Sequence, residues 1–218
     1  TNTIPRDSAL TIPWQKNITV GLNKITRVPA HKLTYDCLII GGGITGITTA
    51  LLLQQAGNQT ILADAHTVGF GTTGGTSAHI NNFADTTFSE AESAFGEKGA
   101  QLFADAIAEG FDIIRQHIAA FKIDCDFETR PGYLYAENED EEKQLDDIYN
   151  GAVKVGVAVE YIEDVPTPVP YKKALKFDGQ AQFHPLKYLE GITAAYVKAG
   201  GVILENALIE KVDSADGM

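Results

Sequence analysis

Three glycines between two apolar runs form the part of this sequence best suited to hold a charged ligand. Gly41, Gly43 and Gly46 follow the apolar run at 36–40 and open a predicted helix over 44–55. In this G-x-G-x-x-G spacing the first glycine permits a turn, and the second lets the backbone approach a pyrophosphate. The third lets the helix and the strand pack closely. The spacing predicts a dinucleotide phosphate site, with a tight strand-to-helix turn without ligand as the alternative.

An acidic residue at the end of the next apolar run narrows the choice of nucleotide. The run at 59–64 ends in Asp64, and the strand–helix–strand order predicts parallel strands in an α/β sheet. A carboxylate at that place can accept both hydroxyls of an adenosine ribose, and it would repel the 2′-phosphate of NADP. These residues therefore indicate an ADP-containing dinucleotide, and by themselves they do not choose between FAD and NAD.

Composition excludes several other functions. The chain has 218 residues, 44% of them hydrophobic, which is ordinary globular composition for one large domain or two small ones. A formal net charge of −12 disfavours nucleic acid and anionic membranes as partners. No apolar run approaches the roughly 20 residues of a membrane span, and the first residues do not resemble a signal peptide. Cys37 and Cys125 indicate two buried thiols in a cytoplasmic protein, with a disulfide or redox pair as the alternative.

The residues after the first βαβ unit divide into a polar loop and a long helical region. Residues 66–82 are rich in glycine and hydroxyl side chains, and loops of this length are usually functional or disordered. Helical periodicity runs through 88–121, where Gly96 and Gly99 predict a break between two helices.

Turn residues and alternation predict further elements on either side of this region. The amino-terminal residues 1–34 show no sustained period, so we expect an extended arm anchored by Trp14. The later elements are two strands around a Pro-Gly turn within 125–138, a helix at 139–156 with a solvated acidic start, a strand at 157–162, a β segment at 174–183 with a turn at Asp178-Gly179, a helix at 185–200, and two β runs within 201–212.

Two distant stretches together resemble one protein family. The segments LIIGGGITGITTALLLQQAG, TILADA and GTTGGTSA resemble the amino-terminal part of FAD-dependent oxidoreductases of the D-amino-acid oxidase superfamily, relatives of glycine and sarcosine oxidase. In that family a loop rich in Gly, Ser and Thr follows the acidic residue and reaches the flavin. The segment FHPLKYLEGITAAYVKAGGVILENALIEKV is similar to the family's helix and strand that lead into a flavin-domain hairpin. The resemblance implies FAD as the cofactor.

The resemblance also implies a division of the chain. It implies an α/β fold, with a Rossmann-like FAD-binding βαβ domain, incomplete here, and an inserted α+β cap or substrate region. The expected parts are an arm at 1–34, the first part of the FAD domain at 35–88, the cap or substrate region at 89–182, and the second part of the FAD domain at 183–218.

The cofactor-binding residues that the resemblance implies form three groups around one FAD molecule. They contact the phosphates and ribityl chain, the adenosine, and the isoalloxazine. In that order they are Gly41, Gly43, Ile44, Thr45, Gly46, Thr72 and Thr73; Asp64, Ala65 and Ile209; and Ser77, Ala78 and His79. No metal site is implied.

Three residues keep alternative roles, and no catalytic residue is assigned. His79 departs from the small or apolar residue that relatives often have. It could stabilise a reduced flavin anion, carry a covalent flavin link, or be an ordinary hydrogen-bonding loop histidine. Arg130, beside a predicted turn, either meets a substrate carboxylate or is a structural surface arginine. His184 is either the entry residue of a helix or a base.

The implied function is an FAD-dependent oxidoreductase that acts on an amine or amino acid by hydride transfer to flavin N5. The alternatives are an NAD-dependent dehydrogenase that uses the same βαβ unit, and a non-catalytic nucleotide-binding remnant. The family's later strand and second glycine motif do not appear before Met218, so we expect the amino-terminal part of a longer protein.

A closer resemblance concerns an electron-transfer partner. The RDS…IPWQ arm together with GGGITGITTA and GTTGGTSA resembles a subgroup fused to a carboxy-terminal Rieske iron–sulfur domain. No Cys-x-His pair occurs in this chain, so the chain itself cannot hold a Rieske cluster.

Overall fold

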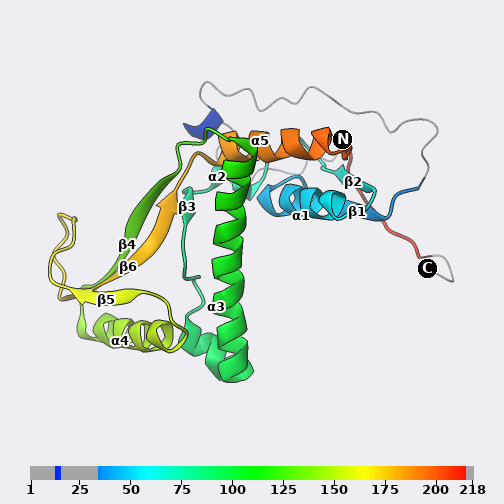
Figure 1. Cartoon of the computed structure of the whole chain (residues 1–218). Coiled ribbons are helices and arrows are strands. Elements are labelled where there is room, and N and C mark those ends of the chain that lie inside the picture. The colour runs from blue at the N-terminus through cyan, green and yellow to red at the C-terminus, as the bar shows by residue number, and fades with distance from the viewer. Residues whose placement is uncertain (1–12, 16–33, 215–218) are drawn as a thin grey trace. The chain divides into compact units, whose positions relative to one another are not determined.

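The computed structural model describes residues 13–15 and 34–214, which form two compact units (Figure 1). Of the described residues, 13–15, 34–77, 118–125 and 184–214 belong to unit 1, and 78–117 and 126–183 belong to unit 2. Each unit is thus assembled from segments that are distant in sequence.

Unit 1 is built on a parallel sheet of three strands. The strands are β1 (Cys37–Ile40), β2 (Thr60–Ala63) and β7 (Val202–Leu204), in the order β1-β2-β7. Leu38 pairs with Ile61, and Ile61 pairs with Val202. The crossover from β1 to β2 runs through helix α1 (Ile44–Gln55), so the predicted parallel βαβ unit is confirmed.

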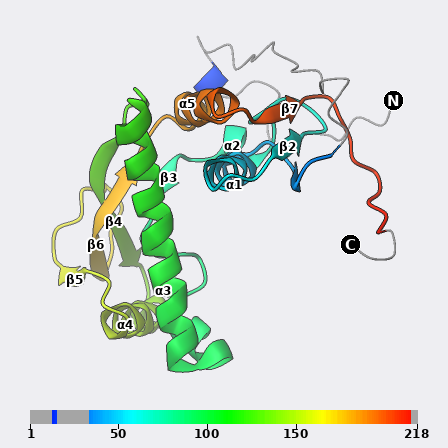
Figure 2. The same ribbon diagram turned by 45° about the vertical axis from the view of Figure 1, so that its right-hand side comes forward.

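Helix α5 (Pro185–Lys198) packs beside α1 (Figure 2). It begins with Pro at its first turn, where the missing N–H costs nothing. The Nδ1 atom of His184 accepts a hydrogen bond from the Lys187 amide at 3.3 Å, so His184 is the N-cap. Of its two predicted roles, that of helix-entry residue is therefore the one observed.

A buried hydroxyl pair fastens α5 to the sheet. The Thr60 and Tyr196 hydroxyl oxygens lie 2.9 Å apart, and Tyr196 shares its single proton between Thr60 and the carbonyl of Val202, which lies 3.3 Å away. Thr60 donates to Gln54 Oε1 at 2.8 Å, which brings in the end of α1. Because buried polar groups are costly unless paired, this network fixes β2, β7 and both helices in register.

The short 3-10 helix η1 (Pro13–Gln15) carries the predicted anchor of the amino-terminal arm. The Trp14 indole Nε1 donates to the carbonyl of Thr76 at 2.9 Å, and its ring meets His184 edge-on at 5.2 Å. Trp14 therefore joins the end of the polar loop to the start of α5. The rest of the predicted arm at 1–34, apart from Thr34, lies outside the described residues.

Unit 2 is an antiparallel sheet with helices packed on one face. Its strands are β3 (His79–Ile80), β4 (Glu128–Ala136), β5 (Val159–Ile162) and β6 (Lys173–Gln182), in the order β3-β6-β4 with β5 also paired to β6. Helix α4 (Glu139–Lys154) packs against the sheet (Figure 1). The core consists of Phe88, Ala104, Ala136, Leu145, Ala152, Leu175 and Phe177.

The long helix α3 (Phe88–Phe121) belongs mostly to unit 2 and contains the predicted break. Gly96 has φ 73° and ψ 175°, so two helices meet there at a kink. The left-handed region is open to glycine without steric cost, which explains why the break falls at this residue. Gly99 lies inside the second helix and makes no break of its own.

Two predicted turns in the β segments of unit 2 are wrong. The Pro-Gly pair at 131–132 lies inside the continuous strand β4, where the register shifts between Arg130 and Gly132. Proline is tolerated in a bulge because the N–H that proline lacks is not needed for the hydrogen bonds between the two strands. Asp178 and Gly179 do not form a turn either. They lie inside β6, opposite the register shift of β4, and Gly179 has φ 77°.

The second β run predicted within 201–212 is also wrong. Only β7 forms, and the described residues after it are irregular. Asn206 has φ 56°, and its amide donates to the carbonyl of His66 at 2.7 Å. The Ala207 amide donates to the carbonyl of Asp64 at 2.8 Å. These bonds direct the chain onto the loop after β2 instead of into a hairpin.

The two cysteines, both of which lie in the described part of the chain, form no disulfide, and one of the two predicted buried thiols is buried. Cys125 is buried just before β4, and Cys37 in β1 is half-buried. Within the described ranges, no helix combines the length and the apolar character that crossing a membrane requires.

Candidate nucleotide-binding site

The glycine turn connects β1 to α1 in a conformation that side chains would block. Gly41 has φ 106°, and its amide donates to the carbonyl of Ala63 at 2.8 Å, which extends the pairing of β1 with β2. A Cβ atom at Gly46 would lie 1.9 Å from the carbonyl oxygen of Gly41. The third glycine therefore permits the first turn of α1 to pass directly over the end of β1, as its spacing predicts.

The carboxylate of Asp64 is aimed at this turn. Its Oδ2 accepts a hydrogen bond from the Gly42 amide at 2.6 Å, and its Oδ1 accepts one from the His66 amide at 2.7 Å. A Cβ at Gly42 would lie 3.1 Å from Oδ2. Asp64, at the end of β2, thus fixes the glycine turn and keeps further lone pairs for hydroxyl donors, since a carboxylate has about four acceptor sites.

Helix α1 is capped by a residue from outside the helix. Its N-cap residue, Gly43, has no side chain, and the Ile44 amide instead donates to the hydroxyl of Thr73 at 3.0 Å. Thr73 lies on the short helix α2 (Thr72–Gly75). The structure gives the Thr45 and Gly46 amides no hydrogen-bond partner among the described residues. Two N–H groups at the positive end of the helix dipole are therefore open to an anion.

The segment after β7 is hydrogen-bonded to Asp64 and to the loop that follows it. The Asp64 amide donates to the carbonyl of Leu204 at 2.9 Å, and Glu205 Oε1 accepts from the Val68 amide at 2.8 Å. Ile209 is half-buried and lies two residues beyond Ala207, and no described contact brings it to the turn. Backbone hydrogen bonds therefore hold residues 204–207 beside Asp64, and the role of Ile209 stays a prediction.

Two residues of this site were missed from the sequence. Gly42, which donates to Asp64, stands in the middle of the glycine run but outside the motif spacing. Glu205 is in the segment quoted for the resemblance, and only its contact with Val68 reveals its role in shaping the loop. The glycine run could have pointed to Gly42, whereas no motif spacing points to Glu205.

The remaining predicted cofactor residues divide between the units. Ala65 follows Asp64, and Thr72 precedes Thr73 on α2, so each is next in sequence to a residue that bonds to the turn. Ser77 ends the first segment of unit 1, whereas Ala78 and His79 begin unit 2. Ala78 is buried at φ 68°, and His79 is exposed on β3.

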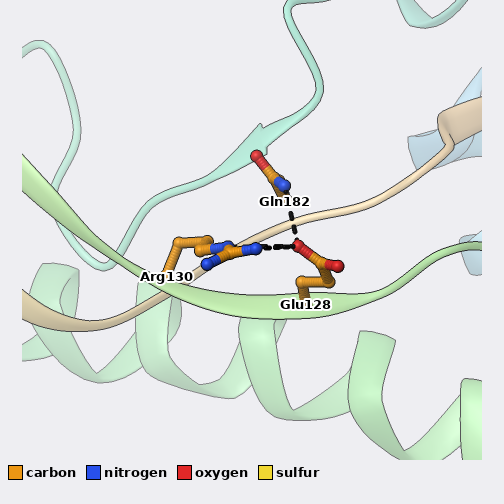
Figure 3. A network of polar contacts seen from close by, with 3 residues as sticks. All are labelled: Glu128, Arg130 and Gln182. Atoms are coloured by element: carbon orange, nitrogen blue, oxygen red, sulfur yellow. Dashed lines mark hydrogen bonds and ion pairs between the residues drawn. The ribbon is translucent and has the colours of Figure 1, made fainter.

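Arg130 lies on β4 and not in a turn, and it is paired within its own sheet (Figure 3). Its Nη2 and Nε donate to Glu128 Oε2 at 2.6 and 3.1 Å, and Gln182 Nε2 donates to the same oxygen at 3.1 Å. The hydrogen bond from Arg130 is the main cause that lowers the pKa of the Glu128 carboxyl, so Glu128 remains ionised.

The chemistry of the turn fits an adenine dinucleotide. It offers open helix amides for phosphates and an acidic side chain for a ribose, without a side chain at the point of closest approach. Among the described residues, no group of His, Cys, Asp and Glu side chains could hold a metal ion.

Comparison with protein families gives a match over most of the chain. The model of the family described as "FAD dependent oxidoreductase" matches residues 36–217. A Bacillus subtilis (strain 168) protein named "Putative Rieske 2Fe-2S iron-sulfur protein YhfW" is 36% identical over 173 residues, which covers 79% of this chain and 34% of that protein. The gamma-glutamylputrescine oxidoreductase of Escherichia coli (strain K12) is 27% identical over 198 residues, which covers 84% of this chain and 44% of that protein.

Solved structures give the same fold. The L-amino acid deaminase from Proteus myxofaciens, in complex with anthranilate, aligns with a TM-score of 0.69 at 16% identity. The alignment covers 87% of this chain and 42% of that structure. The chain thus spans less than half the length of these relatives.

Proposed function

We propose, from the premise that this chain belongs to the family of FAD-dependent oxidoreductases, that it holds FAD at the glycine turn and oxidises an amine or an amino acid. When bound, the flavin accepts at N5 the hydride that leaves the substrate carbon. The observation that carries the proposal is the way the glycine turn is held. The Gly42 amide donates to Asp64, and the Ile44 amide donates to the hydroxyl of Thr73. The family resemblance predicted from the sequence is confirmed by the match.

The phosphates are assigned to the start of α1. The open amides of Thr45 and Gly46 and the helix dipole supply a positive end without any cationic side chain. Thr73, whose hydroxyl already holds the Ile44 amide, orients this end and can donate its own proton to a phosphate oxygen. Gly43 keeps the approach open, because a Cβ there would lie 3.0 Å from the Thr73 hydroxyl.

The adenosine is assigned to the strand ends. Asp64 accepts ribose hydroxyls with the lone pairs that its two backbone donors leave free. Ala65 lies next to it, and residues 204–207 are held against it by backbone hydrogen bonds. Ile209 is retained as an adenine contact only on the resemblance.

The ring-binding role of Ser77, Ala78 and His79 rests on the resemblance and on their position after α2. Ala78 is held at φ 68°, a conformation that non-glycine residues adopt only where the surrounding structure enforces it. The backbone at this step is therefore specified, which is what placing a rigid ring would require.

We also propose an iron–sulfur electron acceptor for the protein in its cellular setting. The support is the 36% identical relative whose name includes a Rieske 2Fe-2S protein. The acceptor would not be held by this chain, which has no Cys-x-His pair. A test is to reduce the flavoprotein anaerobically with substrate and add a purified Rieske protein. Reoxidation by the cluster faster than by oxygen supports the proposal, and reoxidation by oxygen alone contradicts it.

The proposed function is tested by the visible spectrum of the purified protein. Flavin bands that survive gel filtration, and that bleach on anaerobic addition of a substrate amine or amino acid, support the proposal. A colourless protein that takes up NAD and not FAD contradicts it. Flavin that denaturation fails to release from wild type but does release from His79→Ala would assign a covalent link to His79, and flavin released from wild type excludes that link.

A further inference from the structure

Helix α2 is a single turn whose position depends on contacts with other parts of the chain. Its four residues, Thr72–Gly75, include two glycines, and an isolated helix of this length and composition is unstable in water. Within it, the Thr73 hydroxyl accepts a hydrogen bond from the Ile44 amide at 3.0 Å. Just past its end, the Thr76 carbonyl accepts one from the indole Nε1 of Trp14 at 2.9 Å. The α2 segment is therefore held on both sides, and Trp14 holds the second side.

Trp14 is itself fixed against helix α5. The 3-10 helix η1 that carries it, the short blue segment in Figure 2, packs against α5. The Trp14 ring meets the His184 ring edge-on at 5.2 Å, and His184 is the N-cap of α5. Because Trp14, His184 and Thr76 all belong to unit 1, the indole joins the α2 segment to a longer helix of the same compact unit.

The hydrogen bond to Thr76 also orients the next backbone donor along the chain. The Thr76 carbonyl and the Ser77 amide belong to one planar trans peptide group, in which C=O and N–H point in opposite directions. No described residue accepts a hydrogen bond from the Ser77 amide, and Ser77 is exposed. While Trp14 binds the carbonyl on one side, the Ser77 N–H is therefore directed to the other side as an open donor.

We propose that Trp14 is a positioning residue for the cofactor, which holds α2 between the two ends of the proposed FAD site. One end is Thr73 at the start of α1, assigned to the phosphates, and the other begins at Ser77, assigned to the flavin ring. The indole donor keeps the Thr73 hydroxyl at the Ile44 amide and sets the direction of the Ser77 N–H. This proposal rests on the proposed function, and it adds a residue outside the glycine motif to those that determine FAD affinity.

The competing interpretation is that Trp14 only adds buried aromatic surface to unit 1. Its loss would then weaken the whole unit, whereas loss of a positioning contact weakens the contacts of α2 and leaves the others in place. The glycine turn contains both kinds of contact. Its Ile44 amide donates to Thr73 on α2. Its Gly42 amide donates at 2.6 Å to the Asp64 carboxylate, which lies outside α2.

The experiment compares these two amides within one protein. Trp14→Phe keeps an aromatic ring on η1 and removes the indole N–H that binds the α2 segment. In ¹⁵N-labelled protein as purified, NMR measures the rates at which the Ile44 and Gly42 amide hydrogens exchange with water. The matched control is Tyr196→Phe, which removes a buried hydroxyl of unit 1 whose described hydrogen bonds lie outside α2. FAD dissociation constants are measured for wild type and for both variants.

We expect Trp14→Phe to raise the exchange rate of the Ile44 amide about threefold to tenfold relative to that of the Gly42 amide, the factor that corresponds to the loss of one hydrogen bond. The FAD dissociation constant should rise by a similar factor. Tyr196→Phe should leave the ratio of the two rates and the FAD affinity as in wild type, even where it lowers the free energy of unfolding.

An unchanged ratio of the two exchange rates in Trp14→Phe, or an unchanged FAD affinity, overturns the proposal. Tyr196→Phe that changes the ratio and the affinity as much as Trp14→Phe also overturns it, because the effect is then one of stability alone. Wild type that binds no FAD contradicts the proposed function and with it the role toward the cofactor. The exchange ratio then decides separately whether Trp14 holds α2.

Discussion

The hydroxyl oxygen of Thr73 lies 3.0 Å from the amide nitrogen of Ile44, although 29 positions separate the two residues in sequence. This contact gives α1 the cap that its own N-cap, Gly43, cannot supply. It also brings the polar loop to the phosphate end of the proposed FAD site. Thr73, which the sequence predicts to contact the cofactor from a loop, therefore also caps the start of α1.

Removal of this cap should weaken both folding and cofactor binding. Thr73→Val keeps the shape of the side chain but leaves the Ile44 amide without its acceptor, so the free energy of unfolding should fall by about 1 kcal/mol. Urea unfolding and FAD titration measure the two effects. Thr73→Ser keeps the hydroxyl and should behave like wild type, and a Ser variant as weak as the Val variant would contradict the capping role.

Gly46 should not tolerate even one methyl group. A Cβ there would lie 1.9 Å from the Gly41 carbonyl oxygen, so Gly46→Ala should force the backbone apart and destabilise by about 3 kcal/mol or more. The matched control is Gly110→Ala in α3, where a Cβ would meet nothing within 4 Å. That variant should gain up to about 1 kcal/mol from helix propensity. Equal thermal melting of the two variants would contradict the close packing of the turn.

Asp64→Asn removes the charge of the side chain and keeps its shape. An amide side chain has one acceptor oxygen where the carboxylate has two, so either the Gly42 or the His66 amide loses its partner. The expected loss is about 1–3 kcal/mol in the free energy of unfolding, together with weaker FAD binding. Unchanged unfolding in urea would show that these two hydrogen bonds do not hold the turn.

We expect the free energy of unfolding to depend on pH through His117. This histidine of α3 is buried, and burial lowers its pKa below 6.5 in the folded state. The unfolded chain then binds more protons, so the stability that neutral His117 permits is complete above pH 6.5 and declines as the pH falls below that value. Urea unfolding at several pH values should show a steeper acid loss for wild type than for His117→Gln. Parallel pH profiles would contradict this.

The parallel βαβ unit could be predicted because local rules and tertiary packing agree there. The glycine spacing, the acidic end of β2 and the proline at the start of α5 each have one local interpretation, and the structure adopts it. The break at Gly96 could be predicted for the same reason, since few residues adopt φ near +70° without cost.

The errors have a common physical cause. Pro131-Gly132 and Asp178-Gly179 are turn-forming pairs, but β4 and β6 pair on both sides of them, so the irregularity becomes a bulge within one long ladder. The second β run after β7 failed because its amides found acceptors on the loop after β2. In both cases a partner distant in sequence decided the outcome, and local patterns carry no information about it.

The contacts inside the proposed cofactor site could not be predicted from the sequence. The sequence predicts that Asp64 and Thr73 contact the ligand, and the structure shows that both bond to the glycine turn. Arg130 was assigned beside a turn, and it lies within a strand and is paired with Glu128.

The glycine turn is proposed to hold FAD, whose flavin carries out the oxidation. Titration of the flavin-free protein with FAD and, separately, with NAD, in wild type and in Asp64→Ala, tests it most directly. We expect that wild type binds FAD more tightly than NAD and that Asp64→Ala loses most of its FAD affinity while Gly110→Ala does not. Equal FAD affinity in wild type and Asp64→Ala, or preference for NAD, would contradict it.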